Sequence, residues 1–420
     1  MPAINTSHRS SQGDCDMMRD RPFLMRSHVE RGVDALVGLT STGYDGVDRV
    51  ALSVVAEAIL AQRAGQLTSY SRNRSSYTGL TQYGGRDFTY ANVMRAVDHV
   101  AGLGLLELHP GFWRSDGSGR QSTFAATAEL AALGDVVPRI LVRSPTNLIM
   151  KDGAKRLIPY RLTRDARRMM SDLSGWTESV KGSEIRVEAP DIDWSENGLV
   201  SVPHRTNDGD PITIKITTGD FVFYRVFNNA SFAQGGRAYG HWSQSLPKAR
   251  RAQITIDAEP VALLDFSASH PRMLYAQASI PLEGDPYELP GFERDIAKVG
   301  LLVVLNAISR QQGVEAMAHK LAEAKVTGRD RATAAALLSA LEERHKPIQD
   351  HFYRSTGLTC QRTKAVILAD VARQARREGI VTLPVHDEII AKARHESRII
   401  ELMNDAWRMR TGADPVIKRG

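Results

Sequence analysis

The stretch Pro260–Ala276 reads PVALLDFSASHPRMLYA, and the expected fold is built outward from it. Its apolar run from Val261 to Leu264 predicts a buried strand that ends at Asp265, followed by a turn and the start of a helix. A second stretch, LPVHDEIIA over Leu383–Ala391, predicts a strand, an acidic turn and another strand. A carboxylate at the end of an apolar strand is costly to desolvate alone, so two of them brought together imply a cation between them. Mg2+ is the candidate, because it takes hard oxygen ligands, commonly one or two carboxylates plus substrate phosphates.

Four short motifs in and between these stretches resemble, in order, the motifs of family A DNA polymerases and the related single-subunit RNA polymerases. DFSASHPR (265–272) resembles motif A, and VHDE (385–388) resembles motif C. Between them, RDIAK (294–298) is similar to the R-x-x-x-K of motif B, and QRTKAVI (361–367) resembles the helix that precedes motif C. Each motif alone is expected by chance in many proteins, whereas four in the right order are far more specific.

The resemblance implies an α+β fold over residues 227–420: a polymerase palm, with an antiparallel sheet and helices. Only 29 residues separate Asp265 from Arg294 (294 − 265), which implies reduced fingers. The implied activity is template-directed nucleotidyl transfer by a two-metal-ion mechanism, with a primer–template and nucleoside triphosphates as partners. Asp265 and Asp387 are then expected to hold two Mg2+ ions, for which Mn2+ can substitute, with Phe266 adding a backbone carbonyl and Glu388 a weaker ligand.

The motif B residues Arg294 and Lys298 are four apart and share a helix face, which lets both reach one triphosphate. They are expected to neutralise the departing charge, and Lys298 to donate a proton to it. By resemblance Gln361 contacts the minor groove of the primer–template, whereas the alternative is a surface residue of a helix. His386 is expected to support the turn or the primer end.

Three positions depart from the family pattern and leave the choice of sugar open. His270 stands where DNA polymerases of this family carry a Glu that helps to exclude ribonucleotides. On the motif B helix, Leu302 and Asn306 replace an aromatic residue and a Tyr. Because His270 and Asn306 can hydrogen-bond to a hydroxyl, we expect weaker discrimination against ribonucleotides. Arg272 keeps the basic position of motif A, with a structural ion pair as its alternative role.

Just before motif A, Gly235-Gly236-Arg237 predicts a site element. The two glycines let the backbone approach a ligand, and Arg237 adds a donor fork suited to a phosphate or a strand backbone. The alternative is a glycine-rich turn before a strand.

The N-terminal part of the chain predicts different modules. Residues 1–31 are polar and rich in Arg and Ser, and we expect a disordered lead. Residues 46–135 predict helices over 50–63 and 90–103, then strands over 104–109 and 122–125 around a turn over 112–120. This order resembles a winged helix, which in many proteins binds DNA but equally serves as a protein-docking or structural piece. The basic residues near it, Arg72, Arg74, Arg114 and Arg120, favour nucleic acid.

Residues 136–226 predict a basic connecting helix followed by a β-rich region. Arg161, Arg164 and Arg168 fall at helical spacing and are suited to a phosphate backbone. A solvated connecting helix is the alternative interpretation. Ile212–Thr217 alternates apolar and polar residues, as a half-buried strand does.

Composition places few limits on function. At 420 residues the chain can bury a substantial core in two or three domains. Hydrophobic residues at 42% and charged residues at 24% are ordinary for a globular protein, and the formal charge of +6 mildly favours a polyanionic partner. Cys15 and Cys360 form no metal or redox spacing, so a reducing cytoplasm fits better than secretion. The apolar run 299–308 is too short to span a bilayer, so no membrane insertion is expected.

Two other classes of function remain open from the sequence. One is a replication initiator or primase-like RNA polymerase of a mobile element, which primer-independent synthesis would identify. The other is a non-catalytic DNA-binding protein that keeps a decayed palm, and the retention of both carboxylates and both basic residues argues against it.

Overall fold

The computed structural model describes residues 21–22, 28–29, 41–63, 65–79, 81–113, 119–132, 140–141, 146–195, 199–205, 210–218, 221–323, 331–385 and 388–420. The chain divides into two compact units. Unit 1 comprises Met1–Ala230 and Tyr239–Ala258, and unit 2 comprises Ser231–Ala238 and Glu259–Gly420. The expected disordered lead, Arg114, His386 and Asp387 lie wholly or mostly outside the described residues.

Unit 1 contains a helical part with a small sheet and several further β pairs. Its sheets are ordered β1-β3-β7-β4 and β11-β12-β13, with pairs β2-β8, β5-β6, β9-β14 and β10-β16. The elements are β1 (Arg21–Pro22), β2 (His28–Val29), α2 (Asp45–Arg63), β3 (Thr68–Tyr70), η1 (Arg74–Tyr77), α3 (Thr81–Gly84), α4 (Tyr90–Gly102), β4 (Leu106–His109), β5 (Phe112–Trp113), β6 (Gly119–Arg120), β7 (Ser122–Ala126), α5 (Ala128–Ala132), β8 (Ile140–Leu141), β9 (Leu148–Met150), α6 (Arg164–Lys181), β10 (Ile185–Val187), β11 (Asp193–Trp194), β12 (Leu199–Arg205), β13 (Pro211–Thr217), β14 (Tyr224–Asn228), η3 (Trp242–Ser245), η4 (Lys248–Gln253) and β16 (Ile254–Ile256).

The helices and strands predicted between residues 46 and 135 are present as α2, α4, β4 and β7. Their apolar faces form one buried cluster, in which Val54, Val97 and Phe124 are fully buried. β4 and β7 are antiparallel partners, and the short pair β5-β6 extends between them. This is the element order expected of a winged helix, although the DNA-binding role remains a prediction.

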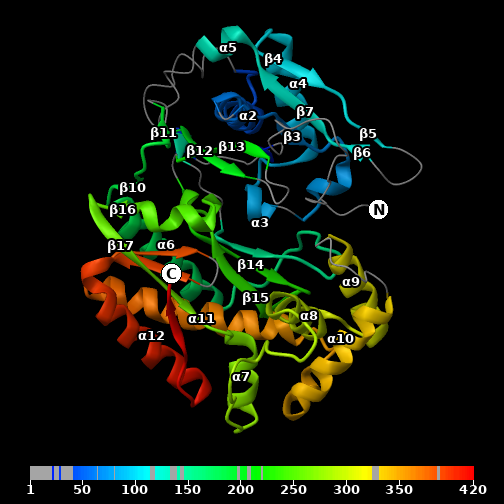
Figure 1. The fold of residues 1–420 in the computed structure, drawn as a ribbon. Coiled ribbons are helices and arrows are strands. Elements are labelled where there is room, and N and C mark those ends of the chain that lie inside the picture. The colour runs from blue at the N-terminus through cyan, green and yellow to red at the C-terminus, as the bar shows by residue number, and fades with distance from the viewer. Residues whose placement is uncertain are drawn as a thin grey trace. The chain divides into compact units, whose positions relative to one another are not determined.

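Unit 2 is built on the strand that carries Asp265, and helices pack against that strand and its neighbours. The elements are β15 (Ser231–Tyr239, with Tyr239 already in unit 1), β17 (Glu259–Phe266), α7 (Ser269–Gln277), α8 (Arg294–Asn306), α9 (Arg310–Glu323), α10 (Arg331–Arg344), η5 (Lys346–His351), α11 (Thr356–Arg377), β18 (Thr382–Val385), β19 (Glu388–Lys392), η6 (Ala393–His395), α12 (Glu396–Thr411) and β20 (Ile417–Arg419). Figure 1 shows α11 running through the middle of this unit, with α12 on one side of it and α8, α9 and α10 on the other.

Strands β17, β18, β19 and β20 of unit 2 pair antiparallel, as predicted for the region around Asp265. β17 pairs with β19 and also with β20, and β18 pairs with β19. Leu264 and Phe266 alternate with Asp265 along β17 and belong to the buried cluster under the helices. Because successive side chains of a strand point to opposite faces, Asp265 is placed on the face opposite that cluster.

Close helix contacts fix the packing of unit 2. Gly300 on α8 lies so near α10 that a Cβ there would come within 2.8 Å of Leu341 Cδ1. At the start of α11, a Cβ on Gly357 would come within 2.5 Å of Asn306 Oδ1. Glycine at these two positions therefore lets α8 approach α10 and α11.

Candidate active site

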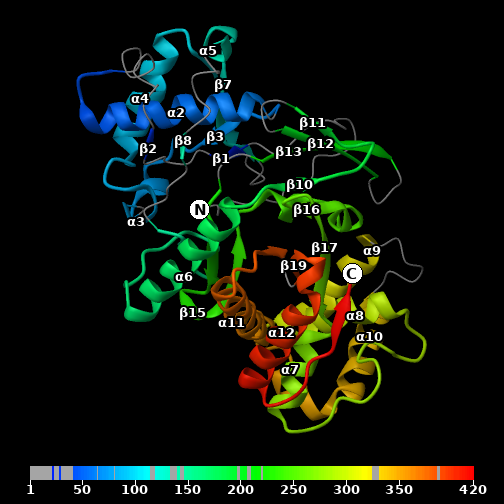
Figure 2. The ribbon, with the colours of Figure 1, turned by 90° about the vertical axis from the view of Figure 1, so that its left-hand side faces the viewer.

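A row of residues across unit 2 contains the two described carboxylates of motifs A and C. Asp265 on β17 pairs directly with Glu388 on β19, and Glu388 pairs with Val385 on β18. On its other side Asp265 pairs with Lys418 on β20, the short C-terminal strand visible in Figure 2. Directly opposed residues of antiparallel strands share a face, so the order along this face is Val385, Glu388, Asp265, Lys418.

Burial changes steadily along this row. Val385 is 1% exposed and Glu388 6% exposed, whereas Asp265 is half-buried and Lys418 is exposed. The carboxylate pair thus opens towards solvent on the side of Lys418. Like charges directly opposite each other on neighbouring strands are destabilising, and burial makes the repulsion stronger. The local charge therefore favours a bound cation.

The connection between β18 and β19 holds His386 and Asp387, which lie outside the described residues. Asp387 precedes Glu388 in sequence, and Glu388 is the direct partner of Asp265. The predicted strands on both sides of this connection are confirmed. The predicted approach of Asp387 to Asp265 stays a prediction.

Phe266 ends β17 and anchors it in the core. Its ring packs on Trp407 of α12, with the ring centroids 4.8 Å apart, and the next residue, Ser267, donates its backbone N–H to Val416 O at 2.8 Å. The Phe266 side chain therefore contributes packing, which leaves only its backbone for the predicted carbonyl ligand.

A lysine of α11 that sequence reasoning missed bonds to the start of α7, just after the turn that follows β17. Ala268 has a positive φ of 49° and directly precedes α7. Ser269, the first residue of α7, accepts a 2.7 Å hydrogen bond from Lys364 Nζ on α11. Both side chains are buried, at 6% and 3% exposure. An ammonium at this depth is costly to desolvate, and its hydrogen bond to Ser269 offsets part of that cost. The bond therefore holds α11 to the turn that follows Asp265.

His270 and Arg272 lie on the first turn of α7, and both are half-buried. Arg272 Nε is buried and has no hydrogen-bond acceptor among the described residues. The charges of Arg272 and Asp265 both act on the pKa of Tyr287. The two motif A residues and Tyr287 therefore belong to one electrostatic neighbourhood.

Tyr287 and Asp285 connect that neighbourhood to the motif B helix. Burial raises the pKa of Tyr287 to about 12, and the positive charge of Arg294 works against that rise. Arg294 donates from Nε to Asp285 Oδ2 at 2.6 Å, and its guanidinium lies 5.2 Å from the centre of the Tyr287 ring. Burial alone would raise the pKa of Asp285, but the hydrogen bond from Arg294 and the charge of Lys418 contribute to a net lowering. Sequence reasoning missed both Asp285 and Tyr287.

Lys298 follows Arg294 by one helical turn and is exposed. It has no hydrogen-bond or ion-pair partner within the described part of the chain, so its ammonium is available to a ligand. Arg294, by contrast, is already bound to a carboxylate. The two motif B residues thus lie on one helix as predicted, but Arg294 is paired with a carboxylate and Lys298 is not.

The side chain at the C-terminal end of α8 is already engaged in contacts within the protein. Asn306 Nδ2 donates to Leu302 O at 2.7 Å, and the Asn306 side chain lies against Gly357. Asn306 is eight residues beyond Lys298, which corresponds to about 12 Å along the helix axis. Leu302 is half-buried. The structure therefore separates Asn306 from Arg294 and Lys298, and the predicted sugar contact of Asn306 has to compete with its bond to Leu302.

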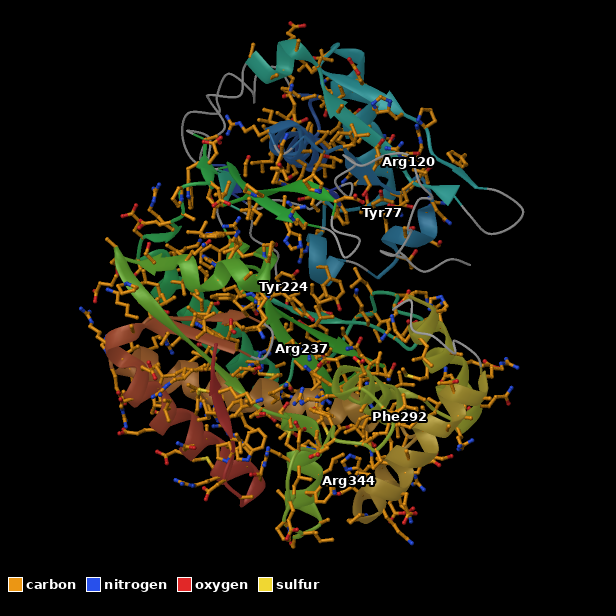
Figure 3. All side chains as sticks on the ribbon, in the orientation of Figure 1. Tyr77, Arg120, Tyr224, Arg237, Phe292 and Arg344 are labelled. Atoms are coloured by element: carbon orange, nitrogen blue, oxygen red, sulfur yellow. The ribbon has the colours of Figure 1, made fainter. Side chains whose placement is uncertain are left out.

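Two predicted nucleic-acid contacts are brought together. With its amide oxygen facing the guanidinium, Gln361 accepts hydrogen bonds from Arg237 Nη1 at 2.9 Å and from Nε at 3.0 Å. Arg237 is labelled in Figure 3 and lies on β15. Gly235 and Gly236 have φ values of 81° and 83° inside this strand. The alternative of a glycine-rich turn before the strand is wrong, because these glycines distort a continuous strand.

Among the residues that the structure describes, no three or more His, Cys, Asp or Glu side chains are placed to share a metal ion. Nor does any helix in this described part of the chain have the length and apolar character needed to cross a membrane.

Comparisons with known proteins identify a distant structural neighbour among solved structures. No protein-family model and no curated protein matches the sequence. Among solved structures, the chain is similar to the POL domain of Pol1 from M. smegmatis in complex with DNA primer-template and dNTP, at 12% identity and a TM-score of 0.33. That match covers 91% of this chain and 65% of the solved chain, so the protein spans under two thirds of the length of that neighbour. A TM-score this low does not indicate a shared fold.

Proposed function

We propose that this protein is a template-directed nucleotidyltransferase of the family A DNA polymerase type, which extends the 3′-hydroxyl of a primer. The observation that carries the proposal is the direct pairing of Asp265 with Glu388 across neighbouring strands. These residues belong to the two sequence motifs that resemble polymerase motifs A and C, and they are 123 positions apart in sequence (388 − 265). Two motifs that arose by chance would not be expected to place their acidic residues directly opposite each other on neighbouring strands.

The donors present fit Mg2+. Asp265 and Glu388 supply hard carboxylate oxygens, and their facing negative charges favour a divalent cation. Asp265 and Asp387 would hold the ions, with Glu388 beside them and the backbone carbonyl of Phe266 as a further oxygen. When bound, Mg2+ activates the primer hydroxyl and neutralises charge on the triphosphate and the departing pyrophosphate.

The side chains of this chain then position the triphosphate. The exposed ammonium of Lys298 binds its phosphate oxygens and donates a proton to the leaving pyrophosphate. Arg294 contributes positive charge while Asp285 holds its guanidinium in one orientation. Arg272, on the first turn of α7, adds a third cation whose Nε has no acceptor among the described residues. Such an arrangement stabilises charge that develops during phosphoryl transfer, which is the main catalytic demand of this reaction.

A primer-extension assay tests the proposal. Purified wild-type protein is given a labelled primer–template with deoxynucleotides or ribonucleotides, in Mg2+ or Mn2+. We expect stepwise extension that Asp265→Asn abolishes. Asp405→Asn is the matched control, because it removes one carboxylate from an exposed position on α12. Extension that survives Asp265→Asn, or a wild type that extends no primer under any of these conditions, overturns the proposal.

A further inference from the structure

The first two turns of α6 in unit 1 carry an unusual arginine cluster. Arg164, Arg167 and Arg168 lie on these turns, Arg161 lies three positions before the helix start, and all four side chains are exposed. We call these residues the α6 arginine cluster. None of these four side chains makes a hydrogen bond or an ion pair with any residue that the structure describes.

Several other exposed arginines of the described chain are paired. On the helices of unit 2, Arg294, Arg310, Arg331, Arg398 and Arg408 each have an Asp or Glu partner. These five exposed arginines are therefore neutralised by a neighbouring carboxylate. The α6 arginine cluster keeps its charge available to solvent and to ligands.

The cluster does not serve the stability of its own helix. Cations near a helix N-terminus are opposed by the helix dipole, and like charges three or four residues apart repel each other, as Arg164 does with Arg167 and Arg168. The N-terminus is already capped, because Thr163 Oγ1 accepts from the backbone N–H of Ala166 at 3.1 Å. Asp165 in the same first turn offsets part of this repulsion, and a bound anion would offset more of it.

The geometry suits a polyanion. Arg164 and Arg168 are about 6 Å apart along the helix axis, and Arg161 extends the row beyond the helix start. A nucleic-acid strand carries one phosphate about every 3.4 Å along its axis, so the row can meet several phosphates of one strand. Arginine is the residue that pairs with phosphate oxygens through two parallel hydrogen bonds.

An anionic membrane is less compatible with this surface. A basic helix that lies on a membrane inserts an exposed apolar face beside its charges. The apolar face of α6 is instead buried in unit 1, where Leu173, Trp176 and Val180 are at most 4% exposed. Leu162, at 38% exposure, is the large apolar residue left exposed beside the cluster.

From these observations we infer that the α6 arginine cluster is a binding surface for the phosphate backbone of a nucleic acid. This inference deepens the proposed function, on which it rests for the identity of the nucleic acid as the primer–template. It assigns backbone binding to a surface outside the sequence motifs of the active site.

The test measures binding without nucleotides, so it is independent of catalysis. A fluorescein-labelled DNA primer–template is titrated with full-length protein by fluorescence anisotropy over a series of salt concentrations. The double variant Arg164→Gln/Arg168→Gln removes two charges of the cluster with residues that favour helix. Arg331→Gln/Arg398→Gln removes two exposed charges that are paired with Glu315 and Glu378, and it serves as the matched control.

A plot of log K against log[salt] has a negative slope, and each lost phosphate contact makes that slope less steep by about 0.9. We therefore expect the slope of the cluster variant to be less steep by about 2. Its affinity for the primer–template should fall at least about tenfold at moderate salt. The control is expected to change affinity less than about twofold, since its charges are already neutralised. Circular dichroism melting should show the cluster variant at least as stable as the wild type.

Two results overturn the inference. One is an unchanged slope and affinity in the cluster variant. The other is unchanged DNA binding together with lost co-sedimentation on phosphatidylserine-containing vesicles, which would identify a membrane surface instead. Loss of DNA binding in the cluster variant supports the inference even if the wild type extends no primer, so failure of the proposed function is recognised separately.

Discussion

Asp265→Asn is expected to make the metal-free protein more stable while it abolishes nucleotide incorporation. The substitution keeps the shape of the side chain and removes one of two facing negative charges. Opposed residues in an antiparallel pair have Cβ atoms about 5 Å apart, and two unit charges at that separation repel by about 3 kcal/mol at an effective dielectric constant of about 20.

Part of that gain is offset, because Asp265 also faces Lys418 on its other side. Lys418 is exposed, so solvent screens its attraction, which is then worth at most about 1 kcal/mol. Removing the Asp265 charge should therefore raise the free energy of unfolding of unit 2 by about 1 to 2 kcal/mol in the absence of divalent cations. Incorporation should fall by at least about a thousandfold.

The assay compares unfolding in urea with EDTA and with Mg2+, followed by hydrogen exchange of peptides from β17 and β19. At a Mg2+ concentration about ten times its Kd, the wild type should gain about 1.4 kcal/mol, and Asp265→Asn should gain little. Asp405→Asn should respond to Mg2+ as the wild type does. The reasoning is refuted if Asp265→Asn is less stable than the wild type in EDTA, or if it keeps the full response to Mg2+.

Three further predictions concern other parts of the chain. Burial lowers the pKa of His241 from 6.5 to about 3, so between these values the unfolded chain binds a proton that the folded protein does not. Stability should therefore fall as the pH is lowered through this window, by up to about 1.4 kcal/mol for each pH unit, and urea titrations of His241→Asn should show a shallower fall than the wild type. Gly300→Ala should lower stability by about 1 to 3 kcal/mol, because the added Cβ meets Leu341, and a variant as stable as the wild type in urea would contradict the close packing of α8 on α10. Lys364→Met should lower the free energy of unfolding by about 1 to 3 kcal/mol, because it leaves the buried Ser269 hydroxyl without its donor. It should also reduce the kcat of primer extension at least about tenfold, because the bond holds α11 to the turn after Asp265. A kcat equal to that of the wild type would contradict a positioning role for Lys364.

The strands around the candidate site could be predicted from the sequence, but their register could not. Apolar runs bounded by polar residues predict β17, β18 and β19 because burial favours them. Which acidic residue faces Asp265 depends on a shift of one residue, since such a shift moves every side chain to the other face. The structure pairs Asp265 with Glu388, which the sequence favoured less than its neighbour Asp387.

Other site residues gave no local signal. Lys418 lies on the three-residue strand β20, which is too short to show a period, and only its pairing with β17 reveals its place. Lys364 looks like a surface residue of an amphipathic helix until Ser269 is found beside its ammonium. For Gly235 and Gly236 the sequence left a glycine-rich turn open as the alternative to a site element, but their positive φ angles occur within β15. In each case long-range contacts decided the outcome.

The path of the chain between the two units limits how the protein can be divided. The chain passes from one unit to the other after Ala230, after Ala238 and after Ala258. A fragment that begins at Glu259 therefore lacks Arg237, and Gln361 on α11 loses the guanidinium to which it is bonded. Unit 2 is not one continuous segment of the chain, so truncation at a single point before Glu259 would remove the β15 residues Ser231–Ala238 from it.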